Sequence, residues 1–278
     1  MSGTLDTLRE DFLEQGFAFP VDILTPQEVE EYRSEMERLE ARLGDMRIGY
    51  KEQLNYPHIL FRFANKLVRS EKLLDAVGKI LGGDIMVWST TIFIKEPQTP
   101  SFVSWHQDLR YWGLSDAGGM LSAWLALSEV TIENGCMRFL PGSHKDGIFE
   151  HDDTHADNNA LTRGQRARVD ISEADTVPVC LAPGQMSLHH GQLLHSSTPN
   201  NSDKRRIGFV TVYIKPSIRQ TLAPKDYAML VRGSDDFEHF IQVPPPEEDL
   251  SEAAKQWHKR VLEVQDEVLY VGDKGPAN

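Results

Sequence analysis

The chain has 278 residues, 40% of them hydrophobic, which is enough for one large core without requiring two ordinary domains. Its formal net charge of −13 repels nucleic-acid backbones and anionic lipid headgroups, so we expect neither nucleic acid nor a membrane as partner. Two cysteines without CxxC spacing argue against a disulfide framework and a zinc-finger module. The sequence shows no apolar leader and no apolar run of about 18 residues, and we therefore expect a cytoplasmic location.

Residues 1–84 are predicted to form an N-terminal helical part. Thr25-Pro26-Gln27-Glu28 combines an N-cap residue, a proline at the first helical position and a glutamate at the third. This capping box is followed by apolar residues at helical spacing, which predicts a helix over about residues 26–43. A second amphipathic stretch over about residues 70–81 ends at Gly82-Gly83 and predicts another helix.

The central part, residues 85–216, is predicted to form an antiparallel β-core. Short runs rich in β-branched and aromatic residues, separated by turn signals, occupy residues 85–94, 120–127, 137–140, 185–194 and 207–214. A polar segment over about residues 143–177 shows little periodicity, and a loop of that length in a compact domain is usually functional. We therefore expect this segment to form a lid or substrate loop.

The C-terminal extension, residues 217–278, is predicted to end in a helix that Ser251 can cap. Apolar residues repeat along this helix at spacings of three and four: Trp257, Val261, Val264 and Val268. The resulting apolar seam either packs on the core or joins two subunits. A homodimer through the C-terminal helix is therefore one expectation.

His106 and Asp108 are the first candidates for metal ligands. They follow a strand-like run, and residues two apart on a strand project to the same face. His195, in a neighbouring predicted strand, is the best candidate for a third ligand. Two imidazoles and one carboxylate leave three positions of an octahedral ion open. That arrangement suits non-haem Fe(II), which must bind a chelating keto acid and O2.

The segment after His195 predicts an anion clamp beside the metal. A turn-rich stretch leads into a strand that begins with Arg205 and Arg206, and we expect a hairpin that returns one of these arginines to the metal. A guanidinium there can bind the distal carboxylate of 2-oxoglutarate. Trp124 and Thr91 fall on predicted inward-facing strands, where they either shape the cosubstrate pocket or pack in the core.

These motifs resemble the phytanoyl-CoA dioxygenase (PhyH-like) family of 2-oxoglutarate oxygenases, over about residues 10–216. The resemblance rests on four features: Trp105-His106-Gln107-Asp108, the segment at residues 133–144, His195-x-Ser197 with Pro199-Asn200 and Arg206, and the N-terminal Gly16 segment with its capping-box helix. It implies a mainly β fold with flanking helices, a double-stranded β-helix (cupin-like jelly roll), as a single domain over residues 1–278. The family's arginine follows the distal histidine by eleven positions, which selects Arg206, and Ser197 matches a serine that helps hold the same carboxylate.

The reaction implied by the resemblance is oxidation of a small molecule with Fe(II), 2-oxoglutarate and O2, which releases succinate and CO2. Halogenating members of the superfamily have a small residue where this chain has Asp108, so hydroxylation is favoured over halogenation. The substrate pocket is predicted to include Trp112, Arg110, His190 and Arg163. Arginines in the predicted lid, Arg163, Arg166 and Arg168, tilt the expectation toward an anionic or zwitterionic substrate, although surface positions are the better explanation for them.

Two other functions remain open at this point. A zinc hydrolase can use the same triad with a metal-activated water. A non-catalytic jelly-roll binding protein is the second alternative. The acidic segment at residues 150–157 resembles a second metal cluster, but its spacing fixes no ligand geometry, and a solvated loop tip is the better interpretation.

Overall fold

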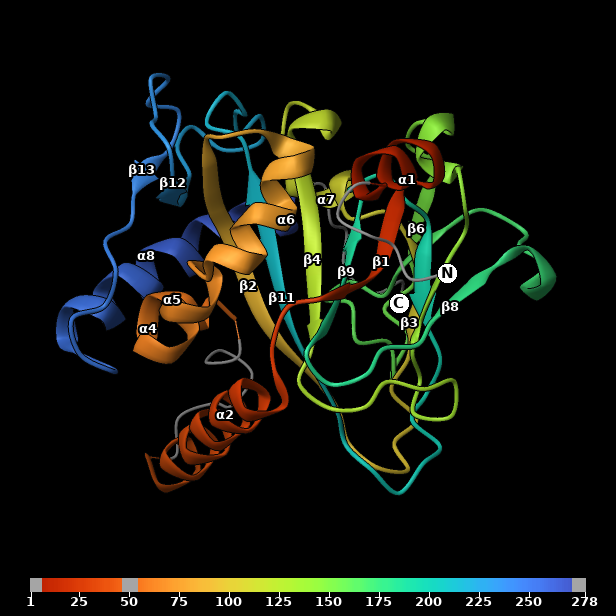
Figure 1. The fold of residues 1–278 in the computed structure, drawn as a ribbon. Helices are drawn as coiled ribbons and strands as arrows, with labels where there is room; N and C mark the ends of the chain where they lie inside the picture. Colours follow the sequence, from red (N-terminus) through yellow and green to blue (C-terminus); the bar gives the residue numbers. More distant parts are fainter. Residues whose placement is uncertain (1–6, 47–54, 272–278) are drawn as a thin grey trace.

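Two β-sheets form the centre of the molecule, a computed structural model that describes residues 7–46 and 55–271 (Figure 1). Within these residues the larger sheet has the strand order β1-β9-β4-β11-β2-β12-β13 and the smaller β3-β10-β5-β8. The strands are β1 (Phe17–Asp22), β2 (Ile85–Lys95), β3 (Val103–His106), β4 (Met120–Ala126), β5 (Met137–Phe139), β6 (His151–Asp153), β7 (Gln165–Ala167), β8 (Val177–Val179), β9 (Gln185–His189), β10 (His195–Ser197), β11 (Arg206–Ile214), β12 (Tyr227–Arg232) and β13 (Ile241–Gln242). All pairings in both sheets are antiparallel except that of β12 with β13. The expected mainly β jelly roll is confirmed.

Helices flank this core: α1 (Leu8–Gln15), α2 (Pro26–Met46), α4 (Pro57–Leu60), α5 (Arg62–Val68), α6 (Glu71–Leu81), α7 (Leu109–Trp112) and α8 (Glu252–Leu269). The predicted capping box is present, because Glu28 N donates to Thr25 Oγ1 at 3.2 Å and Thr25 N donates to Glu28 Oε2 at 2.7 Å. Figure 1 shows α6 lying over strands β2, β11 and β4 of the larger sheet.

One face of the larger sheet packs against the hydrophobic core, and the other face lines a pocket. On β11, Ile207, Phe209 and Tyr213 belong to the core cluster that also contains the apolar side chains of α6. The alternate residues Arg206, Val210 and Val212 instead line a pocket, as the two-residue period of a strand requires. Val210 pairs with Thr91 on β2 and with Trp124 on β4, so both predicted cosubstrate residues stand on the pocket face.

Helix α8 packs on the core of its own chain. Ser251 caps it by accepting a hydrogen bond from Ala254 N at 3.2 Å, and the seam residues Val261, Val264 and Val268 are buried in the main core cluster. The seam that suggested a homodimer is therefore covered within the chain, and the oligomeric state stays a prediction. No described helix is long and apolar enough to cross a membrane.

Three sequence predictions need correction. Strands β10 and β11 do not form a hairpin, because β10 pairs with β3 and β5 in the smaller sheet while β11 pairs with β2 and β4 in the larger one. The strand expected over residues 185–194 ends at His189. The polar segment at residues 143–177, expected to be a loop, contains the β6–β7 hairpin. Ala160, Leu161 and Thr162 within it line the pocket, and its role as a lid stays a prediction.

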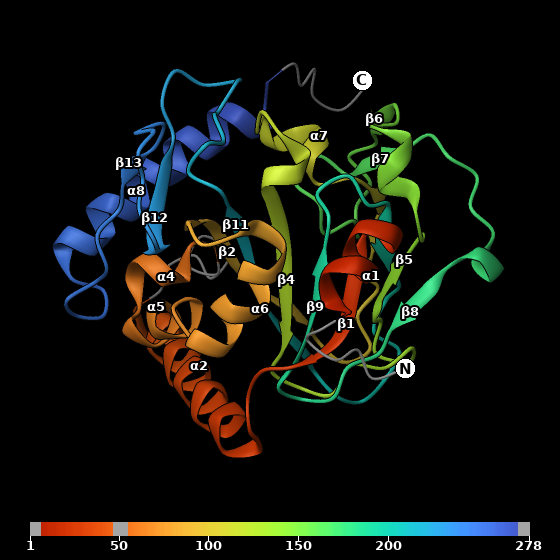
Figure 2. The same ribbon diagram turned by 45° about the horizontal axis from the view of Figure 1, so that its top comes forward.

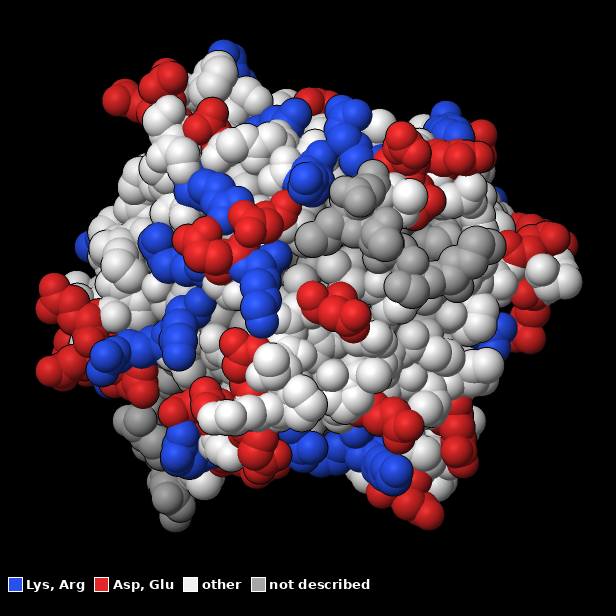
Figure 3. Space-filling view, in the orientation of Figure 1, with Lys and Arg blue, Asp and Glu red and all other residues white. Residues whose placement is uncertain are grey.

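Charged side chains of both signs are mixed on the face shown in Figure 3. Basic side chains lie next to acidic ones there, and no continuous basic surface crosses this face.

Candidate active site

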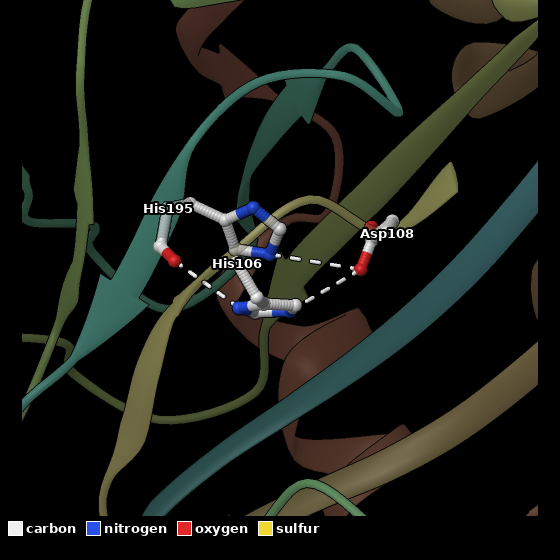
Figure 4. A group of neighbouring side chains, drawn as sticks. All are labelled: His106, Asp108 and His195. Atoms are coloured by element: carbon white, nitrogen blue, oxygen red, sulfur yellow. Dashed lines mark hydrogen bonds and ion pairs between the residues drawn. The ribbon is translucent and has the colours of Figure 1, made fainter. Parts of the chain in front are cut away.

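His106, Asp108 and His195 converge between the two sheets (Figure 4). His106 closes β3 and His195 opens the antiparallel strand β10 directly opposite it, while Asp108 lies at the start of α7. Asp108 Oδ1 is 3.4 Å from His106 Nε2 and 3.7 Å from His195 Nε2. Such separations allow three ligand atoms to reach one ion at bond lengths of about 2 Å.

Backbone carbonyls fix the orientation of both imidazoles. His106 Nδ1 lies 2.9 Å from Ser104 O, and His195 Nδ1 lies 3.0 Å from Leu193 O. Each Nδ1 therefore carries the proton, and each Nε2 presents a lone pair toward Asp108. Burial lowers the pKa of His195 to about 3, so its imidazole is neutral at physiological pH. These are the ligand forms that a divalent iron ion requires.

Two residues that the sequence analysis missed hold the second oxygen of Asp108. Ser122 Oγ donates to Asp108 Oδ2 at 3.0 Å, and His189 Nε2 lies 3.6 Å from the same oxygen. Ser122 and His189 are directly paired across β4 and β9, so only the sheet register reveals them.

Arg206 and Lys95 place two buried positive charges at one end of the pocket. Each is 1% exposed, they are directly paired across β11 and β2, and neither forms an ion pair with any described residue. Lys95 Nζ donates to Ser197 Oγ at 2.8 Å, and the Arg206 guanidinium contacts the Gly135 carbonyl while its Nε has no hydrogen-bond partner. Burial lowers the pKa of Arg206 to about 10, which keeps it charged, and burial with a contribution from Arg206 lowers the pKa of Lys95 to about 7, so Lys95 is partly charged at neutral pH. Uncompensated buried charges of this kind need an anionic ligand.

Arg205 has a different environment, although it precedes Arg206 directly. It lies at the surface and forms bidentate contacts with Glu40 and Glu96, which neutralise it. The two neighbouring arginines therefore point to opposite sides of β11, and Arg206 is the one available to a ligand.

One cavity of about 310 Å³ joins these groups. The following predicted site residues line it: His106, Asp108, His195, Arg206, Ser197, Trp124, Thr91 and Trp112. Its remaining wall includes Tyr111 of α7 and four residues of α8, namely Leu262, Gln265, Asp266 and Leu269. The C-terminal helix, for which the resemblance implied nothing, thus forms part of the pocket.

The other three predicted pocket residues lie elsewhere. His190 contacts the rings of Phe12 and His144, because the chain turns after His189 and the parity expected for one continuous strand does not apply. Arg110 is exposed. Arg163 is buried against Asp153 and donates to the carbonyls of Leu269 and Val271, so it attaches the lid to the end of α8.

The acidic segment at residues 150–157 forms no metal-binding cluster among the described residues. Asp152 instead pairs with Arg168 at 2.5 Å, and Asp153 pairs with Arg163. The expected loop tip with solvated charges needs correction, because His151–Asp153 form strand β6 and are half-buried.

The facial triad next to a buried anion clamp is the site of a 2-oxoglutarate-dependent non-haem iron oxygenase. Comparisons with known proteins agree. A family model described as phytanoyl-CoA dioxygenase (PhyH) matches residues 12–208. A probable alpha-ketoglutarate-dependent hypophosphite dioxygenase from Stutzerimonas stutzeri is 31% identical over 198 residues, which cover 68% of this chain and 67% of that protein. Alignments with several other curated relatives cover about half of those proteins.

Solved structures show the same fold. The non-haem monooxygenase ThoJ in its apo form is 34% identical and has a TM-score of 0.86, covering 95% of this chain and 98% of that one. The alpha-ketoglutarate-dependent epimerase SnoN from nogalamycin biosynthesis is 20% identical with a TM-score of 0.60, covering 88% and 96% of the two chains, and shows the fold alone. The chain belongs to the phytanoyl-CoA dioxygenase family, and its cofactors are iron and 2-oxoglutarate.

Proposed function

We propose that this protein hydroxylates a small-molecule substrate, with conversion of 2-oxoglutarate to succinate and CO2. The observation that carries the proposal is the buried pair Arg206 and Lys95, which lacks an acidic partner among the described residues. Arg206 lines the same cavity as the triad, and Lys95 lies behind Ser197, which also lines it. A dicarboxylate that reaches from the metal to Arg206 would satisfy both ends of this arrangement.

Different residues of the chain would bind the metal, bind 2-oxoglutarate and enclose the substrate. His106, Asp108 and His195 would hold the iron, which together with 2-oxoglutarate and O2 supplies the oxidising power. Arg206 and Ser197 would bind the distal carboxylate of 2-oxoglutarate and so fix its orientation. The lid segment and α8 would exclude water from the cavity and position the substrate. No described residue has to act as a general base.

Hydroxylation is supported by Asp108, because a carboxylate at this position occupies the space that halogenating enzymes leave for chloride. The fold by itself does not specify hydroxylation, because the alpha-ketoglutarate-dependent epimerase SnoN has the same fold. A zinc hydrolase is less consistent with the site, because metal-activated water requires no buried cationic clamp. A non-catalytic binding protein would likewise have no use for four buried polar groups around one cavity.

Succinate formation from 2-oxoglutarate tests the proposal. We expect succinate in the presence of Fe(II) and O2, and its loss in His106→Ala, in which one ligand is missing. We expect Arg206→Met, which removes the positive charge that binds 2-oxoglutarate, to lose succinate formation as well. Arg205→Met is its matched control and should keep the activity, because it removes the neighbouring charge outside the cavity. Activity with Zn²⁺ in the absence of O2 would contradict the proposal.

A further inference from the structure

The outer wall of the cavity combines aromatic rings with one amide and one carboxylate. We define it as Tyr56, Trp88, Trp112, Gln265 and Asp266. The rings of Trp88 and Trp112 contact each other with centroids 5.2 Å apart. Figure 2 shows α8, which carries Gln265 and Asp266, running toward α7, which carries Trp112, and the two helices are in contact. This wall is therefore assembled from segments far apart in the sequence.

A buried carboxylate lies behind the outer wall. Asp226 is 0% exposed, and its Oδ2 accepts hydrogen bonds from Trp88 Nε1 at 2.7 Å and Gln220 Nε2 at 3.0 Å. Its Oδ1 accepts from Tyr227 N at 2.7 Å and Gln265 Nε2 at 3.2 Å. Burial raises the pKa of Asp226, but four donors and no acceptor surround its oxygens, which fits the ionised carboxylate.

Neither Asp226 nor Asp266 has a cationic partner in the described part of the chain. Asp266 itself lines the cavity, and Asp226 accepts hydrogen bonds from two residues that line it, Trp88 and Gln265. The hydrogen bond from Trp88 to a carboxylate also makes its indole ring more electron-rich. An aromatic face of that kind attracts cations.

Positive side chains are scarce in the described wall of the cavity. Among the described residues that line the cavity, Arg206 is the single arginine or lysine, and it belongs to the clamp at the other end. Arg163 is bound to Asp153 and to carbonyls at the end of α8. The expectation of an anionic or zwitterionic substrate rested on the lid arginines, and none of the described lid arginines lines the cavity.

We propose that the substrate carries a positively charged nitrogen group, such as an alkylated ammonium or a heteroaromatic cation, bound against Trp88 and Trp112 with Asp266 at the mouth. The proposal rests on the hydroxylase function above and names its substrate class. A neutral apolar group would desolvate the carboxylate of Asp266 without giving it a partner. An anionic group would be repelled by both carboxylates. A cation is stabilised by the ring faces and the carboxylates together.

A pair of isosteric probes tests this inference. Choline and 3,3-dimethylbutan-1-ol have the same shape but differ in charge, and their Kd values are measured by calorimetry on the enzyme with Fe(II) and 2-oxoglutarate in the absence of O2. We expect choline to bind about tenfold more tightly. Trp112→Leu and Asp266→Asn should each reduce this ratio by about threefold or more, the latter most clearly at low salt. Glu267→Gln removes an exposed charge next along α8 and should leave the ratio unchanged.

Equal binding of the two probes, tighter binding of the neutral one, or failure of both to bind would overturn the proposal. A ratio of the two Kd values that is unchanged in both Trp112→Leu and Asp266→Asn would also overturn it. The charge-transfer absorption of the iron–2-oxoglutarate complex separates this result from the proposed function. If the band forms and the probes show no preference for charge, the oxygenase function stands and the substrate class is wrong. If the band does not form, the proposed function itself fails.

Discussion

Replacing Lys95 by methionine removes a buried positive charge next to the clamp while keeping a side chain of similar length. Lys95 Nζ donates to Ser197 Oγ at 2.8 Å and to the Thr198 carbonyl, so its charge acts on a bound carboxylate through Ser197. Opposite charges 4 Å apart interact by about 4 kcal/mol at an effective dielectric constant of about 20. Because Lys95 lies behind Ser197, we expect about 2 kcal/mol, roughly a thirtyfold increase in the Kd of 2-oxoglutarate.

The same substitution should remove a pH dependence. Burial, with a contribution from Arg206, lowers the pKa of Lys95 from its ordinary value of 10.5 to about 7. Between these values the unfolded chain holds more protons than the unliganded protein, so the stability of the unliganded protein rises with pH in this window. A bound dianion raises the pKa again, so binding takes up a proton above pH 7. The Kd of 2-oxoglutarate should therefore be constant below about pH 7 and rise by up to tenfold per pH unit above it.

Calorimetry with Fe(II) and 2-oxoglutarate in the absence of O2, from about pH 6 to about pH 9, measures both effects. Lys204→Met is the matched control, because Lys204 is exposed and pairs with Glu129 on the surface. A wild-type Kd that does not change with pH, together with an unchanged Kd in Lys95→Met at about pH 6, would refute the reasoning.

Two further predictions concern the metal and the fold. Ser122→Ala removes the hydroxyl that orients Asp108, so metal titration should show an affinity for Fe(II) that is lower by about tenfold to hundredfold. Ser187→Ala is the control. It deletes a buried hydroxyl without a hydrogen-bond partner and should leave the metal affinity unchanged. Ser251→Ala removes the N-cap of α8 and should lower the free energy of unfolding by about 1 kcal/mol in a urea titration. An unchanged urea midpoint would mean that the cap contributes nothing to stability.

Much of the site was predictable because its signals are local. His106 and Asp108 stand two residues apart in the sequence, although Asp108 has helical backbone at the start of α7 and not the strand geometry expected of it. The capping residues Thr25 and Ser251 act on amides within three positions. The selection of Arg206 over Arg205 came from the family resemblance, and the surface ion pairs of Arg205 agree with it.

Contacts between distant segments were decided by the tertiary structure alone. Strand β10 pairs in the smaller sheet and β11 in the larger one, so Arg206 reaches the cavity from the opposite sheet and not through a hairpin. Lys95, Ser122 and His189 take part because of strand register, which no local spacing reveals. Helix α8 becomes a wall of the cavity because its apolar seam is buried on the core, which turns Gln265 and Asp266 toward the pocket. The sequence determined which groups can bind a metal and a dicarboxylate, since those are properties of single side chains and short spacings. The surroundings of these groups depend on pairings across the fold, and only the folded chain brings them together.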